Sequence, residues 1–151
     1  MARGKARVVL VSGSRSWAEE MCPVIHRELS KLPRGSWVIH GGQRRRIPET
    51  IVKNAAGKIV ACEYSGVDYW VDKVAQDLGL LRVVLPFVPG TGKAGGPIRN
   101  SAMCDIAKGL EMTGHEVSAL FFHDDIERSL GTKDCRDKAE RAGLKYDTVR
   151  G

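Results

Sequence analysis

The chain has 151 residues, about one domain's worth, and its composition is that of a globular protein. Hydrophobic residues make up 42% and charged residues 28% of it, which excludes a disordered, collagenous or coiled-coil protein. No charge-free apolar run reaches the roughly 18 residues that a membrane helix needs, and the first residues do not form a signal peptide. We therefore expect a cytoplasmic protein with no membrane partner.

The net charge of +6 comes from two short basic stretches. They are Arg3, Lys5 and Arg7 near the amino terminus, and Arg44, Arg45 and Arg46 further along. Neither stretch contains an acidic residue, and the rest of the chain is balanced in charge. Such stretches can bind phosphates or a nucleic-acid backbone, or they can be a solvated tail and a solvated loop. A DNA-binding protein usually spreads its basic residues along one face, so nucleic-acid binding is the less favoured partner prediction.

Short aliphatic segments alternate with helical ones along the first half of the chain. Residues 7–12 (RVVLVS) are typical of a buried parallel strand, and a Gly-Ser-Arg break follows. Ser16 and Glu19 have the spacing of a capping box, which predicts a helix over residues 16–32. A second strand is predicted over residues 37–40. Residues 43–64 then contain two β-prone segments around a turn, which predicts an inserted β-hairpin.

The second half continues the alternation. A helix is predicted over residues 65–78, with Ser65 and Asp68 as its capping residues. The later predictions are strands over 80–86, 117–122 and 146–149, a glycine- and proline-rich loop over 87–97, and helices over 98–110 and 132–142. This order predicts a single α/β domain, a Rossmann-like three-layer sandwich with a mostly parallel sheet of about five strands.

Glycine-rich or helix-capping clusters follow every strand except the last. In an open parallel sheet, ligands bind beyond the carboxyl ends of the strands, which is where these clusters fall. The candidate ligand-binding residues are Gly13, Ser14, Arg15, Gly41, Gly42, Gly66, Asp68, Gly96, Pro97, Arg99, Asn100, Gly131 and Thr132. Glycines let the backbone approach a ligand, and helix N-termini offer N–H groups to anions. We expect a nucleotide-sized ligand, although tight turns alone also explain any single glycine.

Residue chemistry suggests a role for several candidates. The N–H groups near Gly131 suit a phosphate, and the guanidinium of Arg99 can pair with a phosphate through its fork of donors. Arg15 is either a second phosphate ligand or a solvated surface residue. Asp68 and Asn100 can read ribose hydroxyls or a base edge, with helix capping as the alternative for Asp68. Dependence on Mg²⁺ stays open.

Several other motifs do not match known sites. Residues 90–93 (GTGK) lack the earlier glycine and the following Ser or Thr of a P-loop, which argues against ATP hydrolysis. Cys22, Cys62, Cys104 and Cys135 have no zinc-site spacing and are expected to be free thiols, mostly buried. Residues 123–125 (HDD) are expected to form an exposed turn. His40, at a strand's carboxyl end, has a structural or a functional role.

Four segments together resemble a known family. Residues 9–17 (VLVSGSRSW), 96–103 (GPIRNSAM) and 131–134 (GTKD) resemble the TGSR-x-W, GP-x-RN-x-x-M and GT-x-D segments of a small bacterial and phage branch of the SLOG superfamily. The glycines at 41–42, followed by GVD at 66–68, resemble the branch's HGA-x-x-GAD segment. The resemblance spans nearly the whole chain apart from the insertion. It implies a Rossmann-like fold that binds nucleotides or nucleotide derivatives.

The superfamily includes lonely-guy phosphoribohydrolases, molybdenum-cofactor carrier proteins and the DNA-processing protein DprA. The resemblance therefore implies a nucleotide carrier, sensor or processing protein, and a homodimer. One alternative is cleavage of the N-glycosidic bond of nucleoside monophosphates, with Arg99 and Asp134 as catalytic residues. Cys135 stands where lonely-guy enzymes have a glutamate, so Asp134 would have to replace it. Nucleic-acid binding through Arg44, Arg45 and Arg46, by similarity to DprA, is the other alternative.

Overall fold

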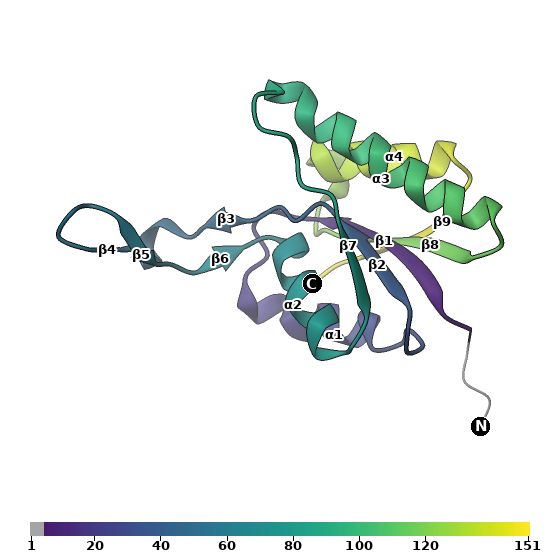
Figure 1. Ribbon diagram of the computed structural model, residues 1–151, viewed down its shortest axis with the longest axis horizontal. Helices are drawn as coiled ribbons and strands as arrows, with labels where there is room; N and C mark the ends of the chain where they lie inside the picture. The colour runs from purple at the N-terminus through teal and green to yellow at the C-terminus, as the bar shows by residue number, and fades with distance from the viewer. Residues whose placement is uncertain (1–4) are drawn as a thin grey trace.

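A five-stranded parallel sheet lies at the centre of the computed structural model, which describes residues 5–151 (Figure 1). The strands are β1 (Arg7–Gly13), β2 (Trp37–His40), β7 (Leu81–Val84), β8 (Glu116–Phe122) and β9 (Lys145–Val149). Their spatial order is β7-β2-β1-β8-β9, and every neighbouring pair is parallel. This sheet confirms the predicted fold class.

Helices cover both faces of the sheet and complete the three layers (Figure 1). On one face lie α1 (Cys22–Leu29) and α2 (Val67–Asp77), and on the other α3 (Gly95–Met112) and α4 (Gly131–Arg141). Short 3-10 turns are η1 (Glu19–Met21), η2 (Pro48–Thr50), η3 (Gly92–Ala94) and η4 (Ile126–Arg128). Within residues 5–151, none of the helices has the length and apolarity needed to span a bilayer.

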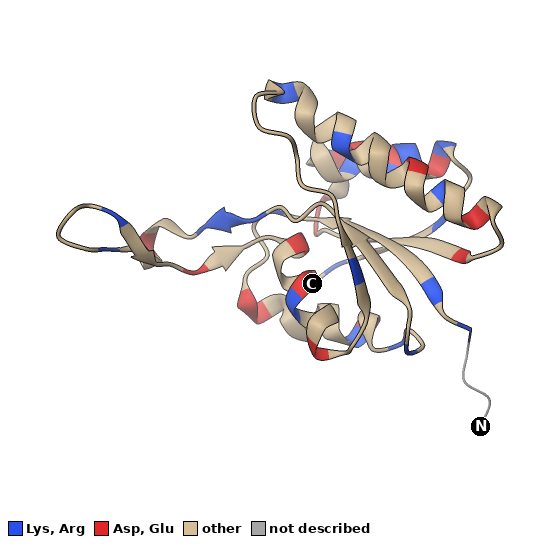
Figure 2. Ribbon diagram, in the orientation of Figure 1, with Lys and Arg blue, Asp and Glu red and all other residues tan. Residues whose placement is uncertain are grey.

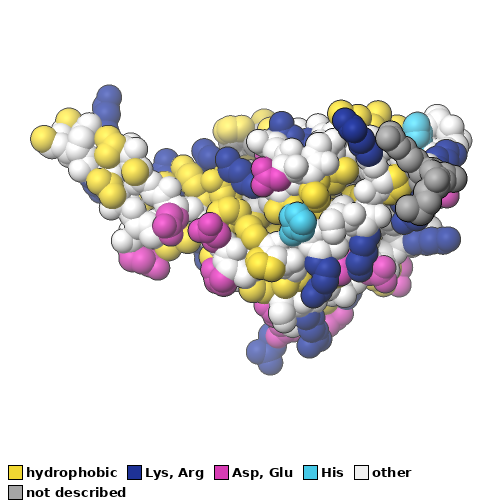
Figure 3. Space-filling view, turned by 90° about the horizontal axis from the view of Figure 1, so that it is seen from below, with side chains coloured by type: hydrophobic (Ala, Val, Ile, Leu, Met, Phe, Trp, Pro, Cys, Tyr) yellow, Lys and Arg dark blue, Asp and Glu magenta, His cyan; other side chains and the backbone are white. Residues whose placement is uncertain are grey.

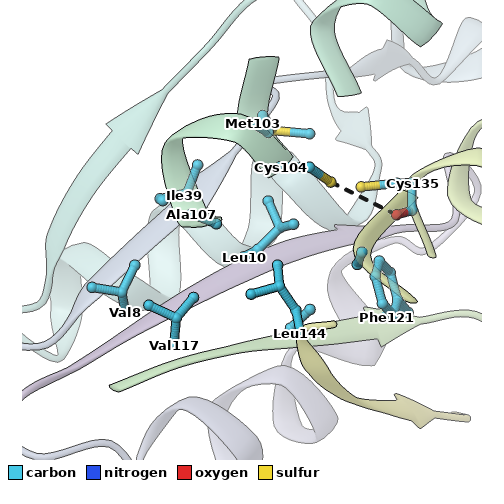
Figure 4. Close-up of a cluster of buried hydrophobic side chains, with 12 residues drawn as sticks. Val8, Leu10, Ile39, Met103, Cys104, Ala107, Val117, Phe121, Cys135 and Leu144 are labelled. Atoms are coloured by element: carbon cyan, nitrogen blue, oxygen red, sulfur yellow. Dashed lines mark hydrogen bonds between the residues drawn. The ribbon is translucent and has the colours of Figure 1, made fainter. Parts of the chain in front are cut away.

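The alternation of side chains along β1 divides the core in two. Val9 and Val11 pack in the cluster with α1 and α2, whereas Val8 and Leu10 pack in the cluster with α3 and α4. All of these side chains are fully or almost fully buried. Figure 4 shows the second cluster, in which α3 and α4 lie against the sheet. The unbroken aliphatic run that predicted this strand therefore reflects burial on both faces.

All four cysteines are free thiols, as expected, but only half of them are buried. Cys104 and Cys135 lie in the core between α3 and α4, and the Cys104 thiol donates a 3.9 Å hydrogen bond to the Cys135 carbonyl (Figure 4). Cys22 and Cys62 are half-buried. The expectation of mostly buried thiols thus holds for the two on the long helices.

The order of the strands creates a switch point between β1 and β8. The chain runs outward from β1 to β2 and β7, then crosses through α3 to β8 and continues outward to β9. The connections that follow β1 and β8 therefore diverge to opposite faces of the sheet. In doubly wound folds this divergence leaves a crevice at the carboxyl ends of the two strands.

A long antiparallel arm interrupts the fold between β2 and α2. Its root pairs β3 (Arg45–Arg46) with β6 (Tyr64–Ser65), and its outer part pairs β4 (Val52–Lys53) with β5 (Ile59–Ala61). Figures 1 and 3 show the arm projecting well beyond the body. The predicted hairpin insertion is confirmed, and the arm's root lies at the carboxyl edge of the sheet.

Both predicted helix caps are wrong. The Ser16 hydroxyl lies 2.9 Å from that of Ser14 instead of capping a helix, and α1 begins only at Cys22 with no side-chain cap. At α2 the capping position is taken by Gly66, and the Ser65 hydroxyl donates to the Arg15 carbonyl at 2.9 Å. These hydroxyls hold the β1–α1 loop, so they are unavailable to the helix ends. The third predicted helix, α3, starts three residues early, at Gly95.

Candidate ligand-binding site

A pocket of about 400 Å³ lies at the switch point, where the carboxyl ends of β1 and β8 meet the starts of α2 and α4. The lining residues are Ser12, Gly13, Ser14, Arg15, Ser16, Gln43, Arg45, Gly66, Val67, Asp68, Arg99, His123, Ser129, Leu130, Gly131 and Thr132. Eight of the candidates predicted from sequence are among them: Gly13, Ser14, Arg15, Gly66, Asp68, Arg99, Gly131 and Thr132. The volume suits a small organic ligand.

Gly13 lets the ends of β1 and β8 and the start of α2 lie close together at the pocket. A Cβ atom there would lie 2.5 Å from the Phe122 carbonyl oxygen and 2.6 Å from Val67 Cγ2. The next residue, Ser14, donates its backbone N–H to the same carbonyl at 2.9 Å. The ends of β1 and β8 are thus held together without a side chain at Gly13, which explains why β1 ends at a glycine.

The N-termini of α2 and α4 both lie at the pocket, but they differ in whether their first backbone N–H groups have acceptors. At α2, the N–H groups of Gly66 and Val67 donate to backbone carbonyls of the β1–α1 loop at 2.8 and 2.9 Å. At α4, within the part of the chain that the structure describes, the N–H groups of Gly131 and Thr132 have no acceptor. Unpaired N–H groups at the positive end of a helix favour an anion. The start of α4 is therefore the pocket's anion-binding end.

Arg99 reaches from α3 into the pocket over a glycine. Its Nη1 donates to the Gly41 carbonyl at 3.1 Å and its Nε to Asn100 Oδ1 at 3.2 Å. A Cβ atom at Gly41 would come within 2.1 Å of Nη1, so the guanidinium needs a glycine beneath it. The guanidinium has five N–H groups, and several remain free for a ligand.

Gln43 lies between two guanidinium groups that it cannot satisfy together. With its amide turned one way, its oxygen accepts from Arg99 Nη2 at 3.4 Å. Turned the other way, it accepts from Arg15 Nη2 at 3.0 Å and Nε at 3.1 Å, and these shorter bonds favour this orientation. An amide has one oxygen, so one guanidinium always keeps unused donors. An anion between Arg15 and Arg99 would satisfy both.

Asp68 is a buried carboxylate with an unused oxygen. It is 7% exposed, its Oδ2 accepts the Gln43 backbone N–H at 3.2 Å, and its Oδ1 has no partner within residues 5–151. Burial raises the pKa of Asp68, opposed by the nearby His40 and Arg99. Among the described residues that line the pocket, Asp68 is the one carboxylate, against three arginines. Its Oδ2 holds the backbone before the arm, and the carboxylate lies in the wall of the pocket, where Oδ1 has almost no exposed surface.

His40 has a structural role behind the pocket. Its Nδ1 accepts the Gly42 backbone N–H at 2.9 Å, so the proton lies on Nε2, which donates to Asp72 Oδ1 at 2.8 Å. Burial opposes ionisation of Asp72, yet the hydrogen bond from His40 and the nearby Arg82 guanidinium hold the pKa of Asp72 below its ordinary value. His40 thus fixes Gly41 and Gly42, and neither glycine lines the pocket.

Asn100 and Asp134 also lie behind the pocket surface. The Asn100 amide donates to the Gly131 carbonyl at 3.1 Å and to Asp134 Oδ2 at 3.0 Å, while its oxygen accepts from Arg99. Lys138 donates to the same Asp134 oxygen at 2.9 Å. Asn100 therefore positions Arg99 and the start of α4. Asp134 links α4 to α3 through its hydrogen bond with Asn100.

Gly96 and Pro97, which the sequence predicts as ligand-binding residues, do not line this pocket. Because α3 begins at Gly95, both residues lie in its first turn instead of in a ligand-facing loop. The Pro97 carbonyl accepts from Lys138 at 2.7 Å, and a Cβ at Gly96 would meet nothing within 4 Å. Arg99, further along the helix, is the residue of this motif that lines the pocket.

The two basic stretches lie at opposite ends of β1. Arg3 is outside the described residues, Lys5 donates to the Gly114 carbonyl, and Arg7 pairs with Glu116 at the strand's start. The run 44–46 lies at the arm's root, on the carboxyl edge, where Figure 2 shows its positive charge. A single nucleic-acid contact would have to span the sheet to touch both stretches.

The remaining pocket residues were not predicted from the sequence. They are Ser12, Ser16, Gln43, Val67, His123, Ser129 and Leu130, together with Arg45, which was predicted only as a nucleic-acid contact. Most of them directly precede or follow a predicted candidate, and that adjacency was the available signal. His123 begins the turn after β8, and no group of His, Cys, Asp and Glu side chains within residues 5–151 is arranged to hold a metal ion.

A comparison with models of known protein families gives no match. A comparison with curated proteins gives no significant match either. The function must therefore be argued from the fold, the pocket and the motifs.

Proposed function

We propose that this protein binds a nucleotide or a nucleotide-derived ligand in the switch-point pocket. The observation that carries the proposal is the chemistry of two groups that line this pocket. Free N–H groups at Gly131 and Thr132 offer an anion site, and the carboxylate of Asp68, whose Oδ1 has no partner within residues 5–151, lines the same pocket. A phosphate next to a ribose would use both, because it combines an anion with hydroxyl donors.

The arginines add to this proposal. Arg15 and Arg99 keep donors that Gln43 cannot satisfy together, and both line the pocket. A guanidinium binds a phosphate through two parallel hydrogen bonds. Membership of the SLOG superfamily is part of the proposal, since it rests on the four sequence segments. The homodimer that this membership implies also stays a prediction, which light scattering of the purified protein tests.

A thermal-shift screen tests the proposal. Nucleoside monophosphates, NAD, ADP-ribose and cyclic nucleotides are each added to the purified protein. A ligand at one hundred times its dissociation constant adds about 2.7 kcal/mol. For a chain of this length, that corresponds to a rise in melting temperature of roughly 5–10 °C. If no compound raises the melting temperature, a small nucleotide ligand is ruled out.

Mass spectrometry of the same mixtures separates binding from cleavage. Cleavage in the lonely-guy manner needs a carboxylate at the ribose, and Asp134 is engaged with Asn100 and Lys138 outside the pocket. We therefore expect the bound nucleotide to be recovered intact. Release of a free base would instead identify a phosphoribohydrolase, with Asp68 as the carboxylate to examine.

A further inference from the structure

A smaller hollow of about 140 Å³ opens off the pocket at the root of the arm. It is lined by Arg15, Gln43, Arg44, Arg45, Ser65 and Gly66. Four of these residues also line the main pocket, so the two spaces adjoin. Residues at the start of α4 line only the main pocket. The small hollow thus extends the site away from the anion-binding end described above.

The small hollow carries positive charge without acidic partners. Arg15, Arg44 and Arg45 are exposed, and none of them forms a salt bridge with any carboxylate of residues 5–151. The Arg44 guanidinium is held 4.3 Å from the centre of the Tyr64 ring, which limits its motion. Three like charges around one hollow repel each other unless an anion lies between them. The Gln43 side chain is neutral and has one oxygen to offer.

The two anion-binding ends lie on either side of β1. The arm's root follows β2, α4 follows β8, and β1 lies between these strands in the sheet. Neighbouring strands are about 4.8 Å apart, so the strands that lead to the two ends, β2 and β8, are separated by about 10 Å. The side chains of Arg15 and Arg45 line both hollows and reach across part of this separation. A ligand that uses both must carry two anionic groups set apart by a spacer.

We propose that the small hollow is a second phosphate subsite, and that the ligand is a nucleotide with two separated phosphate groups. One phosphate binds the N–H groups of Gly131 and Thr132, and the other binds between Arg15, Arg44 and Arg45. A nucleoside 3′,5′-bisphosphate has this chemistry. This inference rests on the proposed function and narrows its ligand class.

Calorimetric titration of paired nucleotides tests the inference. The probes are the 5′-monophosphates and 3′,5′-bisphosphates of adenosine, guanosine, cytidine and uridine. We expect the bisphosphate of the preferred base to bind at least tenfold more tightly than its monophosphate. Arg44→Gln should lower this preference at least fivefold. It should leave the monophosphate affinity unchanged, because Arg44 lines the small hollow and not the main pocket.

Arg46→Gln is the matched control. Arg46 is exposed in β3, two residues after Arg44, but lines neither hollow, so its loss should change neither affinity. Equal affinities for the paired nucleotides, or equal losses in the two variants, would overturn the second subsite while leaving the proposed function intact. Binding of neither nucleotide by the unaltered protein would overturn both.

Discussion

Asp68 shows at the scale of one residue how the pocket trades stability for binding. Its carboxylate is buried, its Oδ1 has no partner within residues 5–151, and burial raises the pKa of Asp68. A buried carboxylate with one unpaired oxygen weakens the folded state. Such a group persists where a ligand uses it, and sites of this kind commonly favour function over stability.

We expect Asp68→Asn to raise the unfolding free energy by roughly 1 kcal/mol at neutral pH, a typical single-residue effect. The asparagine oxygen can still accept from the Gln43 N–H, but the charge is gone. The folded protein binds a proton at Asp68 more readily than the unfolded chain does, so the gain should shrink as pH falls through the raised pKa of Asp68. Urea unfolding at several pH values measures this. Nucleotide affinity should fall at least tenfold.

Asp72→Asn is a control for which we expect a change in the unfolding free energy of the opposite sign. The pKa of Asp72 is lowered by His40 and Arg82 despite partial burial, so its charge stabilises the folded protein. That contribution is present above the unfolded pKa, about 3.9, and is lost as pH falls through the lower folded value. The variant should therefore be less stable at neutral pH. A stabilised Asp72→Asn, or a destabilised Asp68→Asn, would contradict this assignment of charges.

Two glycines that the sequence predicts as ligand-binding residues have different surroundings in the structure. Gly41→Ala would place a carbon within 2.1 Å of Arg99 Nη1 and should displace the guanidinium, weakening nucleotide binding at least tenfold. Gly96→Ala meets nothing within 4 Å and lies in a helix, so it should bind normally and gain up to about 0.5–1 kcal/mol of stability. Calorimetry and urea unfolding measure both effects. Equal binding losses would mean that Gly96 does contact the ligand.

At the scale of elements, the sequence predicted which strands and helices exist better than it predicted the residue at which each helix begins. All five core strands were predicted. The central strands β1, β2 and β8 are mainly apolar because they are buried on both faces, whereas the edge strands β7 and β9 are mostly exposed and β9 is largely polar. Helix starts were misplaced because Ser16 and Ser65 bind within and beside the β1–α1 loop instead of capping helices. No local pattern distinguishes these two uses of a serine hydroxyl.

The arm is the element least needed by the fold. No residue from 47 to 62 belongs to either buried core cluster, and Arg46 pairs directly with Tyr64. Replacing residues 47–63 by an Asn-Gly turn should therefore close the root hairpin. We expect a melting temperature within a few degrees of the parent and unchanged nucleotide affinity, measured by thermal melting and calorimetry. A large loss of either would assign the outer arm to the core or to the site.

At the scale of the molecule, the sequence predicted at which edge of the sheet the candidate site lies, but not which residues line it. Parallel strands bring their carboxyl ends to one edge, so the loops after β1 and β8 had to meet there. The sequence could not show which residues face the pocket. Asn100 and Asp134 differ from Arg99 and Thr132 by direction on a helix, which depends on how α3 and α4 pack.

The most direct test follows the backbone amides of the ¹⁵N-labelled protein during titration with nucleoside monophosphates and ADP-ribose. We predict the largest shifts at Gly131 and Thr132, with further shifts at Gly13, Gln43 and Asp68, because these residues surround one pocket. Changes confined to the outer arm or to the start of β1, or no change with any nucleotide, would contradict nucleotide binding at the switch point.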